Sequence, residues 1–134
     1  MAFHNELGQI GEEAACRYLM HRGYRLLSRN WRFHHLEIDI VAEWYGELVF
    51  VEVKTRSSED FMEAKDAVDF EKKENLIQAA KAYMNYYKLD QPFRFDIITL
   101  VGAAPHFELK QIRNAFTSQG VAEEKMRRKF RLEE

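Results

Sequence analysis

The sequence predicts a mixed β-sheet with helices packed on it, and therefore an α/β or α+β protein. Two segments carry apolar residues at the three- and four-residue spacing of a helix, one near the N-terminus and one in the middle of the chain. Between them, apolar and polar residues alternate along two runs that flank a tight turn, as in a β-hairpin. Further apolar and aromatic runs, typical of strands, follow the second helix. The expected order is α-β-β-β-α-β-β.

The composition favours one globular domain. A chain of 134 residues can form one hydrophobic core, since a domain of this size buries roughly 68% of the surface that its unfolded chain exposes. Two Trp, six Tyr and ten Phe residues with a net charge of −2 exclude a disordered chain. A lone Cys16 excludes a disulfide framework and a thiolate metal cluster. No membrane-spanning run or signal peptide stands out, so we expect a cytoplasmic protein with no membrane partner.

The first helix is expected over residues 5–22. Asn5 is a suitable N-cap, and Gly23 is a natural stop. A strand is expected to follow over residues 24–31. The expected apolar face of the helix consists of Leu7, Ile10, Gly11, Ala14, Tyr18 and Leu19.

Two strands are expected between residues 36 and 55, with a turn at Tyr45-Gly46. Side chains alternate between the faces of a strand, so a register that gathers the apolar residues is strongly preferred. That register pairs Ile40 with Val51 and makes one face wholly apolar. The residues of this face are Ile38, Ile40, Ala42, Val49, Val51 and Val53.

The same register places charged residues opposite one another on the other face. Asp39 faces Glu52, and Glu37 faces Lys54. Directly opposed Cβ atoms lie about 4.5–5.5 Å apart, so the two carboxylates would repel each other. A cation between them, or a proton on one of them, would remove that repulsion.

The remainder of the chain completes the sheet and adds a tail. We expect a polar loop over 57–65, a helix over 71–87, and strands over 93–101, closed by Gly102, and over 107–112. The chain ends in a charged helical or frayed segment. We therefore divide it into a domain over residues 1–118 and a helical tail over residues 119–134.

The charged face of the hairpin suggests metal-dependent phosphodiester hydrolysis. Mg²⁺ prefers oxygen ligands and typically binds one or two carboxylates, water and phosphate oxygens. Asp39 and Glu52 would supply the carboxylates. Lys54 would orient the attacking water or neutralise the phosphate.

An ordinary solvated strand face with cross-strand ion pairs also accounts for these residues, and the pattern by itself favours it. A Glu37–Lys54 pair fits this alternative. However, Val41 and Phe50 lie on the same face, so we expect a helix to cover part of it. Charges at the edge of a covered face cost more to leave unpaired.

The ordered motifs of the chain resemble the YraN-like family of bacterial proteins, over about residues 5–116. That family is placed in the restriction-endonuclease-like, PD-(D/E)xK nuclease superfamily and is similar to archaeal Holliday junction resolvases. The motifs are Gly8-x-x-Gly11-Glu12-x-x-Ala15-x-x-Tyr18-Leu19, Gly23-Tyr24, Asn30-Trp31-Arg32, Glu37-Ile38-Asp39-Ile40-Val41-Ala42, Val49-Phe50-Val51-Glu52-Val53-Lys54-Thr55-Arg56 and Arg94-Phe95-Asp96-Ile97.

The resemblance implies a restriction-endonuclease-like α/β fold, in which helices flank a central mixed sheet. It also implies an active site at the hairpin, with Asp39, Glu52 and Lys54 at the superfamily's Asp and Glu-x-Lys positions. Glu12 matches an acidic residue on the first helix of related resolvases and would add a third carboxylate to the metal site. Lys72 matches a further family position and would contact phosphate, although a plain surface lysine fits equally well.

Several basic residues are candidates for contact with nucleic acid. Arg32 and Arg56 lie near the proposed site in sequence, as do Arg25 and Arg29. The basic cluster between 125 and 131 is flanked by glutamates, so a solvated helix with internal ion pairs explains it better.

We interpret the protein as a nuclease dependent on Mg²⁺ or Mn²⁺ that hydrolyses DNA, with branched recombination intermediates among its expected substrates. The alternative is a non-catalytic nucleic-acid-binding module that keeps the fold. A structural domain without nucleic acid is the third reading. By analogy with junction resolvases, whose substrates have two-fold symmetry, we expect a homodimer.

Overall fold

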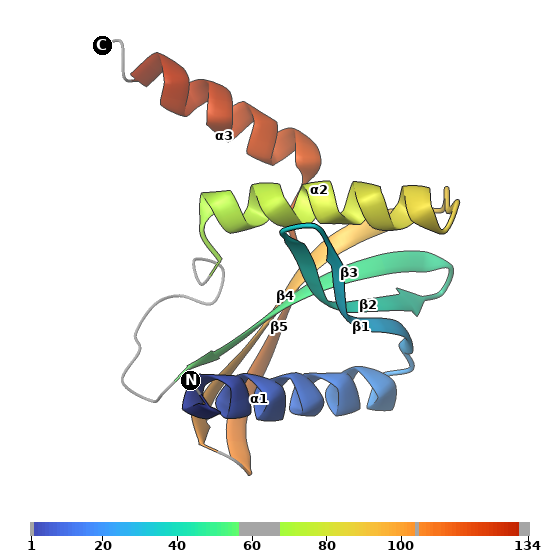
Figure 1. Cartoon of the computed structure of the whole chain (residues 1–134), viewed down its shortest axis with the longest axis vertical. Helices are drawn as coiled ribbons and strands as arrows, with labels where there is room; N and C mark the ends of the chain where they lie inside the picture. Colours follow the sequence, from blue (N-terminus) through green and yellow to red (C-terminus); the bar gives the residue numbers. More distant parts are fainter. Residues whose placement is uncertain (1, 57–67, 104, 132–134) are drawn as a thin grey trace.

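The computed structural model describes residues 2–56, 68–103 and 105–131 (Figure 1). The predicted polar loop at 57–65 lies outside the described residues. The elements are α1 (Ala2–His21), β1 (Arg25–Phe33), β2 (Leu36–Trp44), β3 (Glu47–Arg56), α2 (Phe70–Tyr86), β4 (Phe93–Ala103), β5 (His106–Phe116) and α3 (Ser118–Arg131). This is the predicted order of elements.

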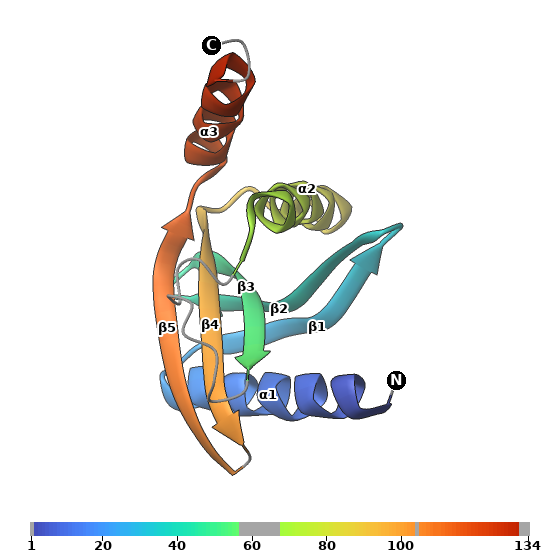
Figure 2. The same cartoon turned by 90° about the vertical axis from the view of Figure 1, so that its left-hand side faces the viewer.

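The five strands form one mixed sheet in the order β1-β2-β3-β4-β5. β3 and β4 are parallel, while the other neighbouring strands are antiparallel. Helix α2 connects the two parallel strands. Figures 1 and 2 show the sheet lying between α1 and α2. The predicted α/β class is confirmed, and the arrangement is consistent with a restriction-endonuclease-like fold.

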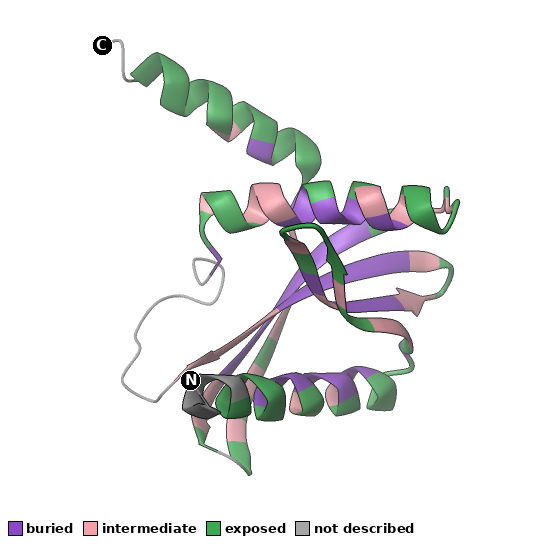
Figure 3. Ribbon diagram, in the orientation of Figure 1, coloured by how far each residue is buried: buried purple, intermediate pink, exposed green. Residues whose placement is uncertain are grey.

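The sheet divides the core into two layers, and its central strands are buried (Figure 3). The layer on the α1 face includes Leu19, Ile40, Val49, Val51 and Ile98. The layer on the α2 face includes Ile38, Val41, Phe50, Leu76, Tyr83, Phe95 and Ile97. The charged face of the hairpin is therefore covered by a helix at Val41 and Phe50, as predicted.

The turn of the hairpin lies at Tyr45-Gly46, as predicted. Both residues have positive φ, 50° and 82°, which matches the right-handed twist of the flanking strands. The register is also confirmed from Trp44 opposite Glu47 to Ile40 opposite Val51.

Helix α1 presents only part of its predicted apolar face to the sheet: Gly11 and Leu19 are buried, and Ala14 and Tyr18 are partly buried. Leu7 and Ile10 are 37% and 45% exposed, whereas Gly11 is buried. A Cβ atom at Gly11 would lie 2.0 Å from Thr55 Oγ1, so the helix approaches β3 too closely for a larger residue there. Besides Leu19 and the site residue Glu12, the buried residues of α1 are small: Gly11, Ala15 and Cys16.

Strands β4 and β5 are longer than predicted. Gly102 does not end β4, because it pairs with Phe107 across the β4–β5 hairpin. β5 continues to Phe116, whose ring stacks on Phe95 at a centroid distance of 5.0 Å. Cross-strand contacts, rather than local sequence, therefore set these ends.

Helix α3 packs on α2 within the region where a charged tail was predicted. Lys125 Nζ lies 3.3 Å from Glu74 Oε2, and the Arg128 guanidinium lies 4.4 Å from the Phe70 ring centroid. Figure 2 shows the rest of α3 projecting away from the sheet. Of the helices in the described part of the chain, none has the length and apolar content needed to cross a membrane.

Candidate active site

The β2–β3 hairpin opens at the predicted carboxylates. Backbone pairing ends at Ile40 and Val51, one position before Asp39 and Glu52 would face each other. The Val53 N–H instead donates to Asp39 Oδ2, at 2.8 Å. Because the strands have separated here, the Val53 amide has no backbone acceptor on β2. The Asp39 carboxylate accepts its hydrogen bond instead. Beyond this point β2 continues with β1 while β3 continues with β4, as Figure 2 shows.

The alternation of side chains between the two faces of the sheet is also interrupted in β2 at Asp39. Ile38 lies in the layer beneath α2, and Ile40 lies in the layer against α1. The prediction that both share one face is therefore wrong. The neighbouring strand β1 is irregular at the same level, because Asn30 has a φ of 51°. Left-handed backbone is tolerated by Asn better than by most residues, and here it accompanies the opening of the sheet.

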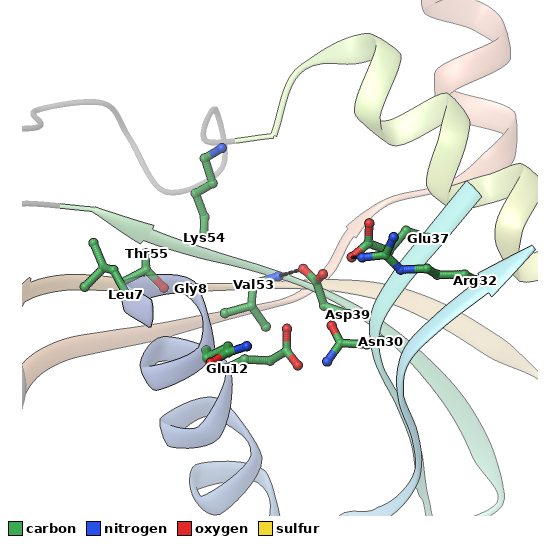
Figure 4. A pocket seen from close by; sticks show the side chains of 11 residues that line it. Leu7, Gly8, Glu12, Asn30, Arg32, Glu37, Asp39, Val53, Lys54 and Thr55 are labelled. Carbon is green, nitrogen blue, oxygen red and sulfur yellow. Dashed lines mark hydrogen bonds and ion pairs between the residues drawn. The ribbon is translucent and has the colours of Figure 1, made fainter. Parts of the chain in front are cut away.

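Glu12 reaches the opening from α1. It is 9% exposed, and its Oε1 lies 3.5 Å from Arg29 Nη2. The Asn30 side chain also hydrogen-bonds to it, and Figure 4 shows the Glu12 carboxylate close to Asn30 and Asp39. Burial raises the pKa of Glu12, against the lowering effects of Arg29 and Asn30.

Glu52 lies beside α2 and is neutralised by a lysine. It is 6% exposed, and its Oε2 lies 3.2 Å from Lys72 Nζ. Burial raises the pKa of Glu52 even though Lys72 and Lys54 act to lower it. The carboxylate in turn raises the pKa of Lys72. The negative charge of Glu52, which is costly to bury, is thus compensated by the positive charge of Lys72 on α2.

Asp39 is the most strongly perturbed of the carboxyl groups. Burial, and next the charge of Glu52, raise its pKa to about 7. Glu12 adds to this rise, while the Val53 N–H and Lys72 oppose it. Asp39 is therefore poised to exchange a proton, or to accept a cation, near neutral pH.

A pocket of about 620 Å³ opens beside these groups (Figure 4). Four sequence-predicted site residues line it: Glu12, Arg32, Asp39 and Lys54. Glu52 and Lys72 meet on the α2 side. Figure 4 shows the Lys54 side chain extending away from Asp39. The lining residues are Leu7, Gly8, Gln9, Glu12, Asn30, Arg32, Glu37, Asp39, Val53, Lys54 and Thr55.

The donor set suits a hard cation bound by few protein ligands. Within residues 2–56, 68–103 and 105–131, no three His, Cys, Asp or Glu side chains converge as a complete metal-binding group. Two of the carboxylates are engaged by cations instead, Glu52 by Lys72 and Glu12 by Arg29. Asp39 with one of these two neighbours still offers the one or two carboxylates that Mg²⁺ typically takes.

The comparisons with known proteins identify the family. A sequence model described as "Uncharacterised protein family UPF0102" matches residues 11–100. The chain belongs to this family. It is 50% identical over 116 residues to a UPF0102 protein of Bacteroides thetaiotaomicron, covering 87% of this chain and 96% of that protein. A UPF0102 protein of Flavobacterium johnsoniae is 42% identical over 120 residues, covering 87% and 98%.

The UPF0102 match includes every residue predicted to be catalytic. It runs from α1 to β4 and so contains Glu12, Asp39, Glu52 and Lys54, together with Lys72, which was predicted to contact phosphate. The names of the family and of these relatives state no activity. The family membership predicted from the motifs is confirmed, and the chemistry of the site rests on its geometry.

The predicted nucleic-acid contacts lie at different places around the UPF0102 site. Arg32 lines the pocket, with its Nη2 3.7 Å from Glu37 Oε1. The predicted pair between Glu37 and Lys54 is therefore replaced by one between Glu37 and its β1 neighbour. Arg56 ends β3 opposite Val101 of β4.

The sequence did not point to Asn30 and Arg29 as partners of Glu12. Asn30 stands in one of the family-like motifs, but a regular strand pattern gives no sign that its backbone turns left-handed. The sequence likewise did not reveal that Lys72 binds Glu52. That contact joins residues twenty positions apart, through the packing of α2 on the sheet.

Proposed function

We propose that this UPF0102 protein is a metal-dependent nuclease that hydrolyses phosphodiester bonds in DNA. The observation that carries this proposal is Asp39, a partly buried carboxylate that feels the charges of Glu52 and Glu12 and lines a polar pocket. Mutually repelling carboxylates of this kind are costly to a fold, and they are used where a cation or proton must be held.

Asp39, with Glu52 or Glu12, would hold Mg²⁺ or Mn²⁺. When bound, such an ion activates water and stabilises negative charge that builds on the phosphoryl oxygens. The resemblance to the PD-(D/E)xK superfamily supports the same assignment, since Asp39, Glu52 and Lys54 match its motif.

The basic residues would act on the phosphate. Lys54, two residues after Glu52 on β3, would neutralise the scissile phosphate or orient the water. Lys72 neutralises Glu52 and, being half-exposed, would contact a phosphate next to it. Arg32, at the edge of the pocket, would bind the backbone of the strand that enters it.

The test is a cleavage assay with the full chain. Linear duplex, single-stranded and four-way-junction DNA would be incubated with Mg²⁺, Mn²⁺ or EDTA. We expect cleavage that requires metal and is lost in Asp39→Asn and in Lys54→Ala. The matched control is Glu13→Gln, which removes an exposed carboxylate from the same helix as Glu12. Full activity of Asp39→Asn would refute the proposed mechanism.

A non-catalytic nucleic-acid-binding module is the second candidate. The ion pair between Lys72 and Glu52 favours it, because a neutralised carboxylate needs no metal. In that case the same DNA probes would bind in EDTA with a strong dependence on salt, and no metal would produce cleavage.

We further propose that the protein acts as a homodimer on branched DNA. This proposal rests on the analogy with junction resolvases and on the two-fold symmetry of their substrates. Sedimentation of the protein with and without a four-way junction tests it. A monomer bound to the junction would contradict it.

A further inference from the structure

A second pocket lies at the far end of α1 from the carboxylates. It has a volume of about 290 Å³ and is walled by the C-terminal end of α1, the end of β2 and the middle of β5. Its lining contains two arginines and three aromatic residues and no acidic residue. The lining residues are Tyr18, Arg22, Tyr24, Trp44, Gln111 and Arg113.

The two lining arginines carry charges that no described carboxylate neutralises. The Arg22 guanidinium lies 4.6 Å from the Tyr18 ring centroid, and the Arg113 guanidinium lies 4.2 Å from the Trp44 ring centroid. In the described part of the chain, neither is within ion-pair distance of an Asp or Glu side chain. Aromatic faces hold both groups in place, and Arg113 also donates through Nε and Nη2 to the Tyr24 hydroxyl at 3.4 Å. Since no described carboxylate offsets either charge, both guanidinium groups can attract an anion.

The wall behind these arginines contains one positive and two negative charges, which are paired with one another. Arg94 binds Asp96 through Nε at 2.9 Å and Glu47 through Nη1 at 2.8 Å. Its Nη2 donates to the Tyr24 hydroxyl at 2.7 Å. Tyr24 also stacks on Trp44, with a centroid distance of 5.3 Å and an interplanar angle of 13°. The pocket therefore has polar, hydrogen-bonded walls, and the charged residues that line it are Arg22 and Arg113.

We propose that this pocket binds a backbone phosphate of a nucleic-acid strand that extends from the carboxylate site along α1. Two guanidinium groups from separate elements can together engage the tetrahedral oxygens of a phosphate, and the aromatic walls suit the adjoining sugar. The ten residues from Glu12 to Arg22 span about 15 Å of helix, which corresponds to roughly four steps of a duplex. The inference rests on the proposed action on DNA, but it concerns binding and needs neither metal nor cleavage.

The test measures DNA binding in EDTA as a function of salt concentration. Arg22→Gln and Arg113→Gln are each expected to reduce the slope of log K against log salt by about 0.9, the value for one lost phosphate contact on duplex DNA. At 0.1 M salt this is a roughly eightfold loss of affinity for each variant. Arg17→Gln is the matched control, because Arg17 is an exposed arginine of α1 that pairs with Glu13 and does not line this pocket. Its slope should not change.

Two further variants and a second probe complete the test. Arg113→Lys keeps the charge but loses the planar fork, and should retain most of the slope while losing affinity. Thermal melting of each variant checks that the fold is intact. Inorganic phosphate and a deoxynucleoside 5′-monophosphate are titrated in parallel. If the monophosphate binds through Arg22 and Arg113 while the DNA slope is unchanged, the pocket takes a free ligand and the strand proposal is overturned.

The outcomes separate this inference from the nuclease proposal. If the protein cleaves DNA and the slope is unchanged in Arg22→Gln and Arg113→Gln, the inference fails alone. If both variants lower the slope but no metal gives cleavage, the nuclease proposal fails alone. If the wild-type protein binds none of the probes, the inference is refuted.

Discussion

Replacing Asp39 by Asn should stabilise the folded protein, and increasingly so as the pH rises. In the fold, burial and then Glu52 raise the pKa of Asp39 from 3.8 to about 7. The unfolded chain therefore gives up this proton at a lower pH than the folded one. A shift of about three pH units corresponds to roughly 4 kcal/mol of stability, present below pH 4 and lost by pH 7 to 8. Asn carries no charge, and its carbonyl can still accept from the Val53 N–H.

The assay is urea unfolding in EDTA at pH 5 and pH 8. The advantage of Asp39→Asn over the wild type should be larger at pH 8 by an amount of order 2 to 4 kcal/mol, with unchanged m-values. Asp90→Asn is the control, because it makes the same substitution at an exposed carboxyl. A difference between Asp39→Asn and wild type that does not grow with pH would refute the reasoning that Asp39 is destabilised by burial and by Glu52.

Two further predictions concern the approach of α1 to β3 and the buried ion pair of Arg94 with Asp96. Gly11→Ala should cost about 1 to 3 kcal/mol in urea unfolding, since its Cβ would lie 2.0 Å from Thr55 Oγ1. Gly8→Ala, with no atom within 4 Å of the added Cβ, should be neutral or stabilising, and equal effects of the two changes would contradict the close approach of α1. Asp96→Asn should cost about 3 to 5 kcal/mol by the same measurement, because it removes a fully buried counter-charge of Arg94. A loss below about 1 kcal/mol would show that this ion pair is dispensable.

Some features of this protein follow from local periodicity. The alternation along 36–55 determined the turn at Tyr45-Gly46 and the register of Ile40 with Val51, since a slip by one residue would expose the valines. The spacing of apolar residues likewise identified the buried face of α2, including Leu76, Ala80 and Tyr83. In these cases the spacing of apolar residues within one strand or helix is enough to show which of its side chains are buried.

The face of α1 could be predicted only in part. The periodicity correctly included Gly11 and Leu19, which are buried, but it also included Leu7 and Ile10, which are substantially exposed. The helix instead turns small residues to the sheet, because Gly11 allows it to approach β3 at Thr55. The spacing of apolar residues shows how apolar a helix face is, but it does not show how closely a neighbouring strand approaches that face.

The candidate site shows the same division. The sequence by itself determined which residues have the right chemistry, namely Asp39, Glu52 and Lys54 on two adjacent strands, and the family-like motifs added Glu12. Only the tertiary structure decided how they are used. The sheet opens at Asp39, and α2 brings Lys72 to within 3.2 Å of Glu52. Burial between the two layers then raises the pKa of Asp39, because desolvation and long-range charge depend on elements that are distant in the chain.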